Sequence, residues 1–451
     1  MTAKVVDYTQ SQTTITNYSK TRYISSDIMD QEWNSIWQGT WLLAGLTSDL
    51  ETPGDYFVFS IGTEQILVSK TSKGTIEAFY NVCQHRGNQL VTSRRGNAKS
   101  FRCAYHAWTY DHDGNLKSVP SKDRFKLDPH CENLALRKVH CAYWNGLVFI
   151  NLAEQTETLE SYLGPVADLL EAYHFEEMTL VQDQTVHLDC NWKAVVDNFG
   201  ELYHVDFLHP QHKRMVDCRN DIVRLFKNGH TGVEVPGATV NPRYPVPEHP
   251  TDIQSSQLNS LGLNPDDFKG RVLDIRQAVQ KQKKLIDTDL GMNYHRFSDD
   301  QLSDVWQYNL FPNAILSFTP EHCWILRPRP HPTDPQRCEF DKISLVKFAN
   351  STDPNKDILG PGKTSALLNP SDKTNSERKR PETDVFTYDQ VINGEKDMTD
   401  TINQDVALLG GVQKGMASKG FDKVFLSDDE VRIQHFHDHL DLQLHKDPPH
   451  E

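Results

Sequence analysis

The chain has 451 residues, of which 37% are hydrophobic and 24% charged, and its mean hydropathy is −0.60. A chain of this length is expected to form two or three domains, and no apolar run reaches the roughly 18 residues that a membrane span requires. We therefore expect a globular protein outside the membrane. A formal net charge of −15 argues against a nucleic-acid partner, because phosphate binding needs a basic face.

The N-terminal sequence and the cysteine content both favour a cytoplasmic protein. The first thirty residues are polar throughout and lack the basic start and apolar middle of a secretory signal, which favours a cytoplasmic protein. Eight cysteines without regular spacing suit a reducing compartment, where Cys and His together more often hold a metal. Six of them have no partner in the sequence pattern and are expected to be small buried side chains: Cys131, Cys141, Cys190, Cys218, Cys323 and Cys338.

The region from about residue 38 to 152 has the pattern of short β-strands separated by turns. Residues 56–62, 64–70 and 76–82 are rich in aromatic and β-branched side chains, and residues 146–152 close the series. Gly-Thr and Thr-Ser-Lys-Gly separate the first three segments. Strands of this length and spacing predict a small β-sandwich.

The next part of the chain alternates between helical and strand patterns. A helix is predicted over residues 163–174 and an alternating strand over 179–189. Residues 191–210 predict a second helix, which Pro210 would end because proline cannot continue a helix and restricts the residue before it. A Pro-rich stretch then breaks the pattern, and the polar sequence up to about residue 304 is expected to be largely helical.

Strand patterns return in the last third of the chain. They are predicted at residues 313–318, 323–329 and 338–348. Residues 349–382 are rich in Pro, Ser, Asp and Lys and are expected to form a surface loop that contributes little to the hydrophobic core. Helical periodicity resumes at 400–418. Strands and helices that occur in separate runs are typical of an α+β fold.

Two short motifs place a Cys–His pair on each of two loops. Cys83 and His85 are separated by one residue, Cys103 and His106 by two, and the sequence between the pairs is long enough for a β-hairpin that brings the loops together. In a two-iron, two-sulfur Rieske centre, two thiolates hold one iron and two neutral imidazoles hold the other. Each loop supplies one ligand of each type, so we predict that these four residues bind a [2Fe-2S] cluster.

A Cys₂His₂ zinc site uses the same four ligands and is the alternative interpretation. Zinc ligands usually come as Cys-x₂₋₄-Cys followed by His-x₃₋₅-His, a grouping that this stretch lacks. Gly87 and Gly114 offer tight-turn freedom nearby, and Tyr105 and Trp108 are expected to shield the cluster.

At these residues the chain resembles the Rieske family, through C-x-H-R-G at 83–87 and C-x-Y-H-x-W at 103–108. The resemblance implies an iron–sulfur domain, which occurs both in small ferredoxins that carry electrons and in larger oxygenases. The remaining three hundred or so residues of the chain distinguish a ferredoxin from an oxygenase.

A second candidate site follows in the segment DNFGELYHVDFLHP. Asn198, Glu201 and His204 are spaced i, i+3, i+6 and would share one face of the predicted helix. His209 would be turned off that face on an unbroken helix, but the helix end at Pro210 allows it to bend back. Two imidazoles and one carboxylate form the arrangement that holds non-haem Fe(II) with open positions. The alternative is one core histidine and one solvated histidine.

Taken with the Rieske motif, the pattern N-x-x-E-x-x-H-x₄-H-P resembles the catalytic domain of a Rieske non-haem iron oxygenase large subunit, and the resemblance covers residues 35 to 440. It implies that His204, His209 and an Asp on a late helix hold the iron. QDVALLGGVQKGM places Asp405 in that role, although many members have a Glu where this chain has Gly410. The other candidates are Asp397 and Asp400; an ordinary amphipathic helix with a solvated Asp is the remaining alternative.

The resemblance also implies the fold and the domain limits. We expect an α+β protein with a Rieske-type β-sandwich and a helix-grip, START-like catalytic domain built on a curved antiparallel sheet. Residues 1–37 would pack on the catalytic domain, 38–152 would form the Rieske [2Fe-2S] domain, and 153–451 would form the mononuclear iron domain.

The implied assembly is a head-to-tail homotrimer, with or without a small β subunit. Electrons would come from NAD(P)H through a separate flavin reductase, directly or through a ferredoxin, because the chain has no G-x-G-x-x-G nucleotide fingerprint. Glu201 would bridge His106 of one chain to His204 of the next. A basic group would either steer an acidic electron donor or be ordinary surface charge: Arg86, Arg94, Arg95 and Lys99.

The implied reaction is O₂-dependent hydroxylation of an aromatic or similarly apolar small molecule. Many ring-hydroxylating members have Asp where this chain has Glu201, and Glu occurs in the branch that oxidises quaternary amines, so a monooxygenase acting on such amines or by N- or O-demethylation is the alternative. Three aromatic residues near this site would form a cage for a quaternary ammonium group, an apolar wall for an arene, or part of the protein core: Phe199, Tyr203 and Phe207. Asn198 would either face the iron pocket or pack between helices. A non-catalytic electron-transfer protein is the third possibility.

Overall fold

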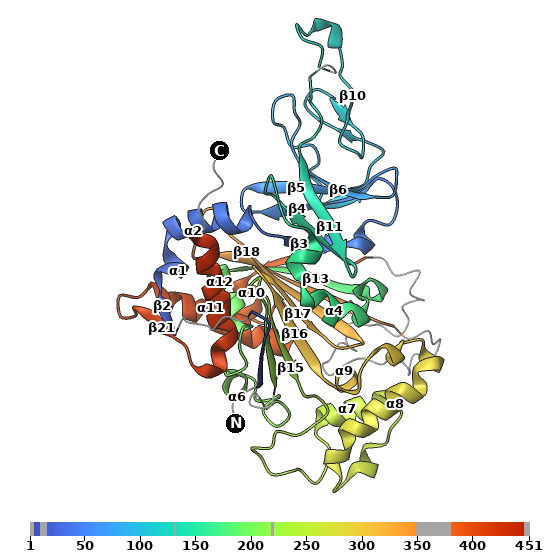
Figure 1. The fold of residues 1–451 in the computed structure, drawn as a ribbon, viewed down its shortest axis with the longest axis vertical. Coiled ribbons are helices and arrows are strands. Elements are labelled where there is room, and N and C mark those ends of the chain that lie inside the picture. The colour runs from blue at the N-terminus through green and yellow to red at the C-terminus, as the bar shows by residue number, and fades with distance from the viewer. Residues whose placement is uncertain (1–3, 10–15, 130–131, 218–220, 349–379, 446–451) are drawn as a thin grey trace. The chain divides into compact units, whose positions relative to one another are not determined.

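The computed structural model describes residues 4–9, 16–129, 132–217, 221–348 and 380–445. Contacts within the chain define two compact units. One is formed by Asp30–Tyr162, and the other by Met1–Met29 together with Leu163–Asp447. Each unit has its own sheet and core (Figure 1).

The unit formed by Asp30–Tyr162 is built from antiparallel strands. Seven strands form one sheet in the order β3-β12-β11-β6-β5-β4-β7, and three short strands form a second in the order β10-β9-β8. This confirms the predicted strands and the Rieske-type β-fold. The strands are β3 Leu42–Leu46, β4 Asp55–Ile61, β5 Glu64–Lys70, β6 Ile76–Tyr80, β7 Arg95–Asn97, β8 Phe101–Arg102, β9 Thr109–Tyr110, β10 Leu116–Ser118, β11 Lys138–Trp144 and β12 Leu147–Asn151.

Packing in the core of this unit explains why a glycine is required at position 114. Leu67, Phe79 and Tyr110 are fully buried between the two sheets. Gly114 lies in the turn between β9 and β10 with φ +83°, and a Cβ built there would lie 2.4 Å from a ring carbon of Phe79. Only glycine satisfies both the backbone conformation and this close approach.

The second unit is built on a nine-stranded curved sheet in the order β1-β14-β15-β16-β17-β18-β19-β13-β20 (Figure 1). All pairs are antiparallel except those of the two edge strands, which are parallel to their neighbours. This confirms the predicted curved sheet. The strands are β1 Lys4–Asp7, β13 Thr179–Leu188, β14 Ile222–Leu225, β15 Thr231–Val235, β16 Val305–Leu310, β17 Ala314–Phe318, β18 His322–Pro330, β19 Cys338–Val346 and β20 Asp384–Thr387.

Helices pack on this sheet and on one another. The helix α5 Trp192–Asn198 contacts β18 and β19, α12 Val431–Leu444 contacts β14 and β15, and α11 Asp400–Ala417 packs on α5. The remaining helices are α1 Thr21–Ile24, α2 Ser26–Glu32, α3 Leu159–Leu163, α4 Pro165–Leu170, α6 Val205–Leu208, α7 Asp252–Ser260, α8 Ile275–Leu290, α9 Asp299–Ser303 and α10 Tyr388–Ile392. A small two-stranded antiparallel sheet is formed by β2 Asn17–Ser19 and β21 Lys423–Phe425, which come from opposite ends of the chain.

The predicted single helix over 191–210 is wrong. α5 ends at Asn198, and only the single turn of α6 follows, so Glu201 lies between two helices. The break falls at a glycine, which has a low helix propensity. A Cβ built on Gly200 would lie 2.9 Å from Cγ1 of Ile433, so α12 passes close to the chain here. The predicted shared helical face of Asn198, Glu201 and His204 therefore does not exist as one continuous helix.

The sequence patterns did not predict α12, because its buried face is largely polar. Arg432, His435, His437 and His439 are all buried on this helix. Nε2 of His437 lies 3.0 Å from Oδ1 of Asp197, near the end of α5. This contact ties α12 to the end of α5, just before the segment that carries the second site.

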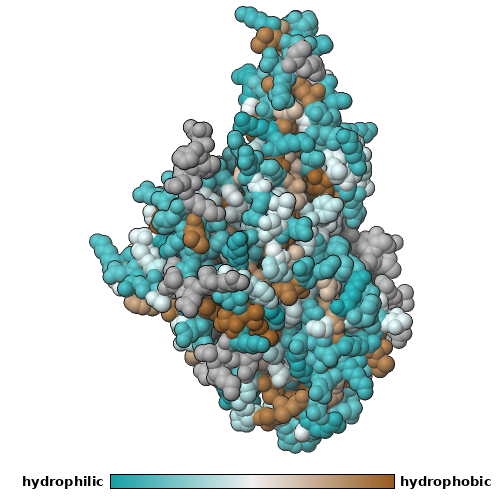
Figure 2. Space-filling model, in the orientation of Figure 1, coloured by the Kyte–Doolittle hydropathy of each residue, from teal (hydrophilic) through white to brown (hydrophobic). Residues whose placement is uncertain are grey.

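The surface and the cysteines agree with a globular chain. Hydrophilic side chains cover most of the face shown in Figure 2, with apolar groups scattered among them. No helix in the described ranges is both long and apolar enough to cross a bilayer. Cys190, Cys323 and Cys338 are buried as predicted and Cys141 is half-buried, whereas the other two predicted buried cysteines, Cys131 and Cys218, lie outside the described residues.

Candidate metal centres

The two Cys–His loops of the first unit fold as equivalent turns. In the first, N–H of Gly87 donates to the carbonyl of Cys83 at 3.0 Å, and in the second, N–H of Ala107 donates to the carbonyl of Cys103 at 3.0 Å. Gly87 has φ +72° and Ala107 φ +58°. Gly87 supplies the turn freedom that the sequence predicts, but its counterpart is an alanine in a left-handed conformation, which no sequence pattern indicated.

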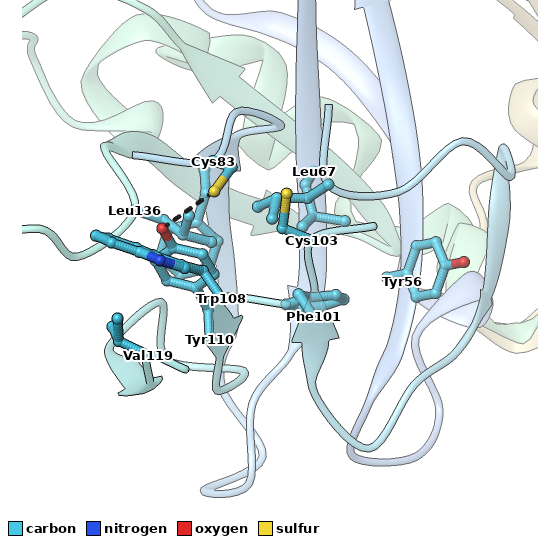
Figure 3. Close-up of a cluster of buried hydrophobic side chains, with 11 residues drawn as sticks. Tyr56, Leu67, Cys83, Phe101, Cys103, Trp108, Tyr110, Val119 and Leu136 are labelled. Carbon is cyan, nitrogen blue, oxygen red and sulfur yellow. Dashed lines mark hydrogen bonds between the residues drawn. The ribbon is translucent and has the colours of Figure 1, made fainter. Parts of the chain in front are cut away.

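The four predicted cluster ligands lie together at the tips of these turns. The ring centroids of His85 and His106 are 4.6 Å apart. Cys83 and Cys103 are both 2% exposed, and both belong to the buried cluster drawn in Figure 3. Nδ1 of His85 is buried and has no hydrogen-bond partner. An unpartnered imidazole nitrogen beside two thiols fits a metal cluster, because buried polar atoms otherwise find partners.

Hydrogen bonds and burial distinguish the two thiols. Burial raises the pKa of Cys83. Burial also acts to raise the pKa of Cys103, but hydrogen bonds from backbone N–H groups of Tyr105 and His106 outweigh it and lower this pKa. Backbone donors aimed at sulfur stabilise the thiolate, which is the form that binds metal. Nδ2 of Asn88 also lies 3.6 Å from Sγ of Cys103.

Aromatic side chains surround the cluster ligands unequally. Trp108 is buried and its ring stacks on His85, with centroids 4.8 Å apart and an interplanar angle of 6°. Tyr105, the other predicted shield, is 55% exposed. Phe125, which the sequence did not single out, has its ring centroid 6.0 Å from that of His85. The hydroxyl of Tyr110 lies 3.6 Å from Sγ of Cys83 (Figure 3).

The second unit brings His204, His209 and Asp405 together. One ligand atom from each of these residues can be chosen such that all three lie within 4.8 Å of one another, and no other described residues form such a set. Nε2 of His209 lies 3.2 Å from Oδ1 of Asp405, and Nε2 of His204 lies 3.6 Å from the same oxygen. Two imidazoles and one carboxylate thus face a common point.

The local structure explains why two histidines five positions apart can converge. His204 precedes the single turn of α6 and His209 follows it, so both side chains leave the helix ends. Asp405 comes from α11 and is 1% exposed. Its Oδ1 atom is buried without a hydrogen-bond partner. A buried carboxylate oxygen that receives no hydrogen bond between two imidazoles fits a cation, because an uncompensated buried charge is costly.

The two other predicted aspartates do not join this group. Asp397 and Asp400 are exposed, and Oδ1 of Asp397 accepts hydrogen bonds at 2.8 Å from the backbone of Thr399 and the side chain of Asn403. Gly410 also has a local explanation, since a Cβ there would lie 2.9 Å from the hydroxyl of Tyr388. The ring of Tyr388 occupies the space beside α11 that a larger residue would need.

A second layer of side chains holds the two imidazoles. The Glu201 carboxylate accepts a hydrogen bond from Nδ1 of His204 and another, at 3.0 Å, from the His204 backbone. Nδ1 of His209 lies 2.7 Å from Oε1 of Gln404, a residue that the sequence analysis missed. Burial acts to lower the pKa of His209, but the neighbouring carboxylate of Asp405 outweighs it and raises this pKa.

Asn198 is the last residue of α5 and is half-buried. Its Nδ2 atom is buried without a hydrogen-bond partner. Its role beside the iron or between helices stays a prediction.

The charge of a buried arginine, Arg432, interacts with that of Glu201. Arg432 is 3% exposed, and its two terminal nitrogens each lie 3.4 Å from Oε1 of Gln307. Burial lowers the pKa of Arg432 to about 10, against the opposing charges of Asp221 and Glu201. Burial raises the pKa of Asp221 to about 7, which the charge of Arg432 only partly offsets.

Asp221→Asn is expected to change the pH dependence of stability. A carboxyl group with a raised pKa stabilises the folded state below its unfolded pKa, and this contribution is lost as pH rises through about 7. The variant should therefore gain at least ~1 kcal/mol of unfolding free energy over the wild type between pH 5 and pH 8, because one pKa unit corresponds to about 1.4 kcal/mol. Urea denaturation at both pH values measures this difference.

Asp183→Asn is the matched control, because Asp183 is also buried but lies 2.9 Å from Arg380, and its charge does not act on Asp221. This variant should show no gain in unfolding free energy over the wild type at pH 8. Parallel pH profiles for Asp221→Asn and wild type would contradict the raised pKa.

Comparison with known families covers both units. Residues 175–446 match the family described as "Ring hydroxylating alpha subunit (catalytic domain)", and residues 40–139 match the "Rieske [2Fe-2S] domain". The first match spans the converging histidines and aspartate, and the second spans the two Cys–His loops.

Curated relatives match over part of their length. The glycine betaine monooxygenase oxygenase subunit of Chromohalobacter salexigens is 32% identical over 182 residues, which is 40% of each chain. The large oxygenase component of the naphthalene 1,2-dioxygenase system of Pseudomonas fluorescens is 34% identical over 194 residues, 42% of this chain and 43% of its own. The matched stretch thus spans well under half of either relative.

Solved structures share the fold over nearly the whole chain. A quaternary ammonium Rieske monooxygenase in complex with L-carnitine aligns with a TM-score of 0.65 at 20% identity, covering 95% of this chain and 96% of that one. Naphthalene 1,2-dioxygenase with indole aligns with a TM-score of 0.67 at 19% identity, covering 97% and 95%. With the catalytic-domain match over more than half of its length, the chain belongs to the family of ring-hydroxylating alpha subunits that combine a Rieske domain with a catalytic domain.

Proposed function

We propose that the chain is a terminal oxygenase subunit that uses O₂ and electrons to hydroxylate a small organic molecule. The observation that carries this proposal is the convergence of two Nε2 atoms on the unpartnered buried oxygen of Asp405, in a chain that also has two equivalent Cys–His loops. The residues that would hold Fe(II) are His204, His209 and Asp405, and those that would hold the [2Fe-2S] cluster are Cys83, His85, Cys103 and His106.

Each proposed group would supply one kind of chemistry. Fe(II) bound by two imidazoles and one carboxylate keeps positions open for O₂ and substrate, and the cluster stores an electron for the reaction. The protein's contribution lies in its own side chains. Glu201 orients His204 through Nδ1, which leaves Nε2 free to face Asp405, and Trp108 shields His85 from water.

The proposed substrate is aromatic or similarly apolar, and the alternative is a quaternary amine or another demethylated substrate. The chain is similar both to proteins named for glycine betaine, a quaternary amine, and to proteins named for naphthalene, an aromatic compound, so both substrate classes are retained. Phe199 is 8% exposed and stacks on Phe340, so it belongs to the core. Tyr203 and Phe207 are 53% and 77% exposed, so within one chain these three aromatics do not form a closed cage.

Labelled O₂ tests the function directly. The full chain would be given ¹⁸O₂, NADH and a surrogate reductase with a mixed panel of arenes, methoxyarenes and methylated amines, and the products would be analysed by mass spectrometry. Two labelled oxygens on one ring would establish a dihydroxylating dioxygenase. One labelled hydroxyl, or formaldehyde with a demethylated product, would establish a monooxygenase. Absence of label from every product, with cluster and iron both present, would contradict the proposal.

We also propose the partners that this chemistry needs. Electrons would come from NAD(P)H through a reductase, with or without a ferredoxin, in a cytoplasmic homotrimer with or without a small β subunit. Glu201 would connect His106 of one copy to His204 of the next. Its contact with Nδ1 of His204 supports this role, because a carboxylate between two imidazole N–H groups orients both.

Charge reversal at the basic group should weaken the approach of an acidic electron donor. Arg86 and Arg94 are exposed, and the guanidinium of Arg86 lies 5.0 Å from the ring centroid of Tyr105, beside the cluster ligand His106. Arg86→Glu/Arg94→Glu is expected to raise the apparent KM for the donor about tenfold at low salt, and less at high salt, because long-range attraction is screened.

The control for this experiment is charge reversal of a basic residue in the other unit. Arg271 has a side chain that is 66% exposed, and Arg271→Glu changes the net charge without touching the Cys–His loops. An equal rise in KM for both variants would show that only net charge matters, and would remove the docking role.

A further inference from the structure

His209 is held at both edges of its ring by neighbouring residues of one helix. Nε2 lies 3.2 Å from Oδ1 of Asp405, and Nδ1 lies 2.7 Å from Oε1 of Gln404. Because Asp405 and Gln404 are consecutive on α11, a single turn of this helix fixes the position and the rotation of the imidazole.

The contact with Gln404 also selects the tautomer. An amide oxygen can only accept a hydrogen bond, so Nδ1 of His209 carries the proton. In the neutral ring this leaves the lone pair on Nε2, the atom that faces Asp405 and His204. A metal ligand needs this form, because the metal binds the unprotonated nitrogen.

Other side chains hold the Gln404 amide in this orientation. Nε2 of Gln211 donates to the same Oε1 atom at 3.0 Å and approaches Oγ1 of Thr401 at 3.4 Å. Oγ1 of Thr401 also lies 2.9 Å from Nε2 of His212. In this arrangement Oε1 of Gln404 is the common acceptor for Nδ1 of His209 and Nε2 of Gln211.

The two imidazoles therefore have different partners. Nδ1 of His204 meets the carboxylate of Glu201, whereas Nδ1 of His209 meets a neutral amide. The site already contains two carboxylates, Glu201 and Asp405, with side chains 10% and 2% exposed. A neutral partner for His209 orients the ring without adding a third negative charge to this buried region.

We propose that Gln404 is a positioning residue that sets the tautomer and ring orientation of His209 for metal binding. The inference rests on the proposed function, because it assumes that His204, His209 and Asp405 hold a divalent metal. It goes beyond that function by assigning metal affinity to a residue outside the ligand set.

The test uses the full chain with its cluster, stripped of mononuclear metal and titrated anaerobically with Fe(II) against a chromophoric chelator. Co(II) serves as a spectroscopic probe, because its visible absorption reports the ligand geometry. Gln404→Leu is expected to weaken Fe(II) binding roughly 10- to 100-fold, the usual effect of removing such a partner. It should also change the Co(II) spectrum.

Gln404→Glu is the rescue variant, because a carboxylate oxygen accepts the same hydrogen bond, and its Fe(II) affinity should stay within about threefold of the wild type. Gln413→Leu is the matched control. Gln413 lies on the same helix, α11, and is buried, whereas Gln404 is half-buried; it accepts a hydrogen bond at 2.8 Å from the backbone of Asn191. Its loss should lower stability and leave both metal readouts unchanged.

Each outcome bears on a separate claim. Unchanged affinity and spectrum in Gln404→Leu would overturn the positioning role, whereas failure of the wild type to bind either metal would overturn the proposed function. If Gln404→Leu does not fold, Gln211→Ala decides, because Gln211 lies at the surface and only orients the amide. A several-fold loss of affinity in that variant would support the role, and wild-type affinity would overturn it.

Discussion

His204→Ala is expected to abolish product formation while the [2Fe-2S] cluster remains. His204 supplies one of the two imidazoles that face Asp405, and its loss leaves a site with one imidazole and one carboxylate. The cluster ligands belong to the other compact unit and should be unaffected. Turnover should fall by at least 1,000-fold, and bound mononuclear iron should be lost, while the visible absorption of the cluster keeps its wild-type intensity. Product analysis, iron content and absorption spectra measure these three properties.

His187→Ala provides the control for this experiment. His187 lies on β13, with Nδ1 3.8 Å from Glu339 and a side chain that is 41% exposed, and it belongs to neither site. Its removal should leave turnover, iron content and cluster absorption unchanged. Survival of turnover in His204→Ala with an intact cluster would refute the catalytic assignment and would favour a protein that only transfers electrons.

Lys283→Met is expected to cause a large loss of stability in the unit that contains the converging histidines. Nζ of Lys283 lies 2.6 Å from Oε1 of Glu321, and the two side chains are 5% and 3% exposed. Lys283 also donates to the carbonyl of Leu302 at 2.7 Å. Removing one partner leaves a buried charge without compensation, which typically costs about 3–5 kcal/mol. The midpoint of urea denaturation should fall accordingly.

The pH dependence of this variant gives a second check. Burial acts to raise the pKa of Glu321, but the charge of Lys283 outweighs it and keeps the pKa below its usual value. Without Lys283 this pKa should rise, so the destabilisation should become smaller at acidic pH. Lys283→Met/Glu321→Met should recover much of the loss, since an apolar pair of similar volume can replace a buried ion pair. A double variant no more stable than Lys283→Met would show that the ion pair is not the cause.

Local sequence determined the parts of both sites whose ligands are close in the chain. Cys83, His85, Cys103 and His106 lie on two turns of one hairpin-sized segment, and His204 and His209 flank a single helical turn. Spacing in the chain is enough to place such side chains together, because short loops allow few conformations. Runs of aromatic and β-branched residues likewise predicted β4 and β5, and an alternating pattern predicted β13.

Tertiary structure decided what depends on distant segments. The predicted single helix over 191–210 is broken near Gly200, where Ile433 of α12 packs against the chain, a contact that no local pattern records. α12 itself went unpredicted because its buried face carries Arg432 and three histidines. Distant segments supply partners to several of them, including Gln307, the carbonyl of Phe226 and Asp197.

The second layer of the metal site shows the same limit most clearly. Gln404 reaches His209 across 195 positions of sequence, and nothing in the sequence around α11 marks it as a partner of an imidazole. Sequence patterns report which side chains can bind a metal, because ligand chemistry is a property of residue types. Which nitrogen carries the proton is decided by the hydrogen-bond acceptor that the folded chain brings to the other edge of the ring.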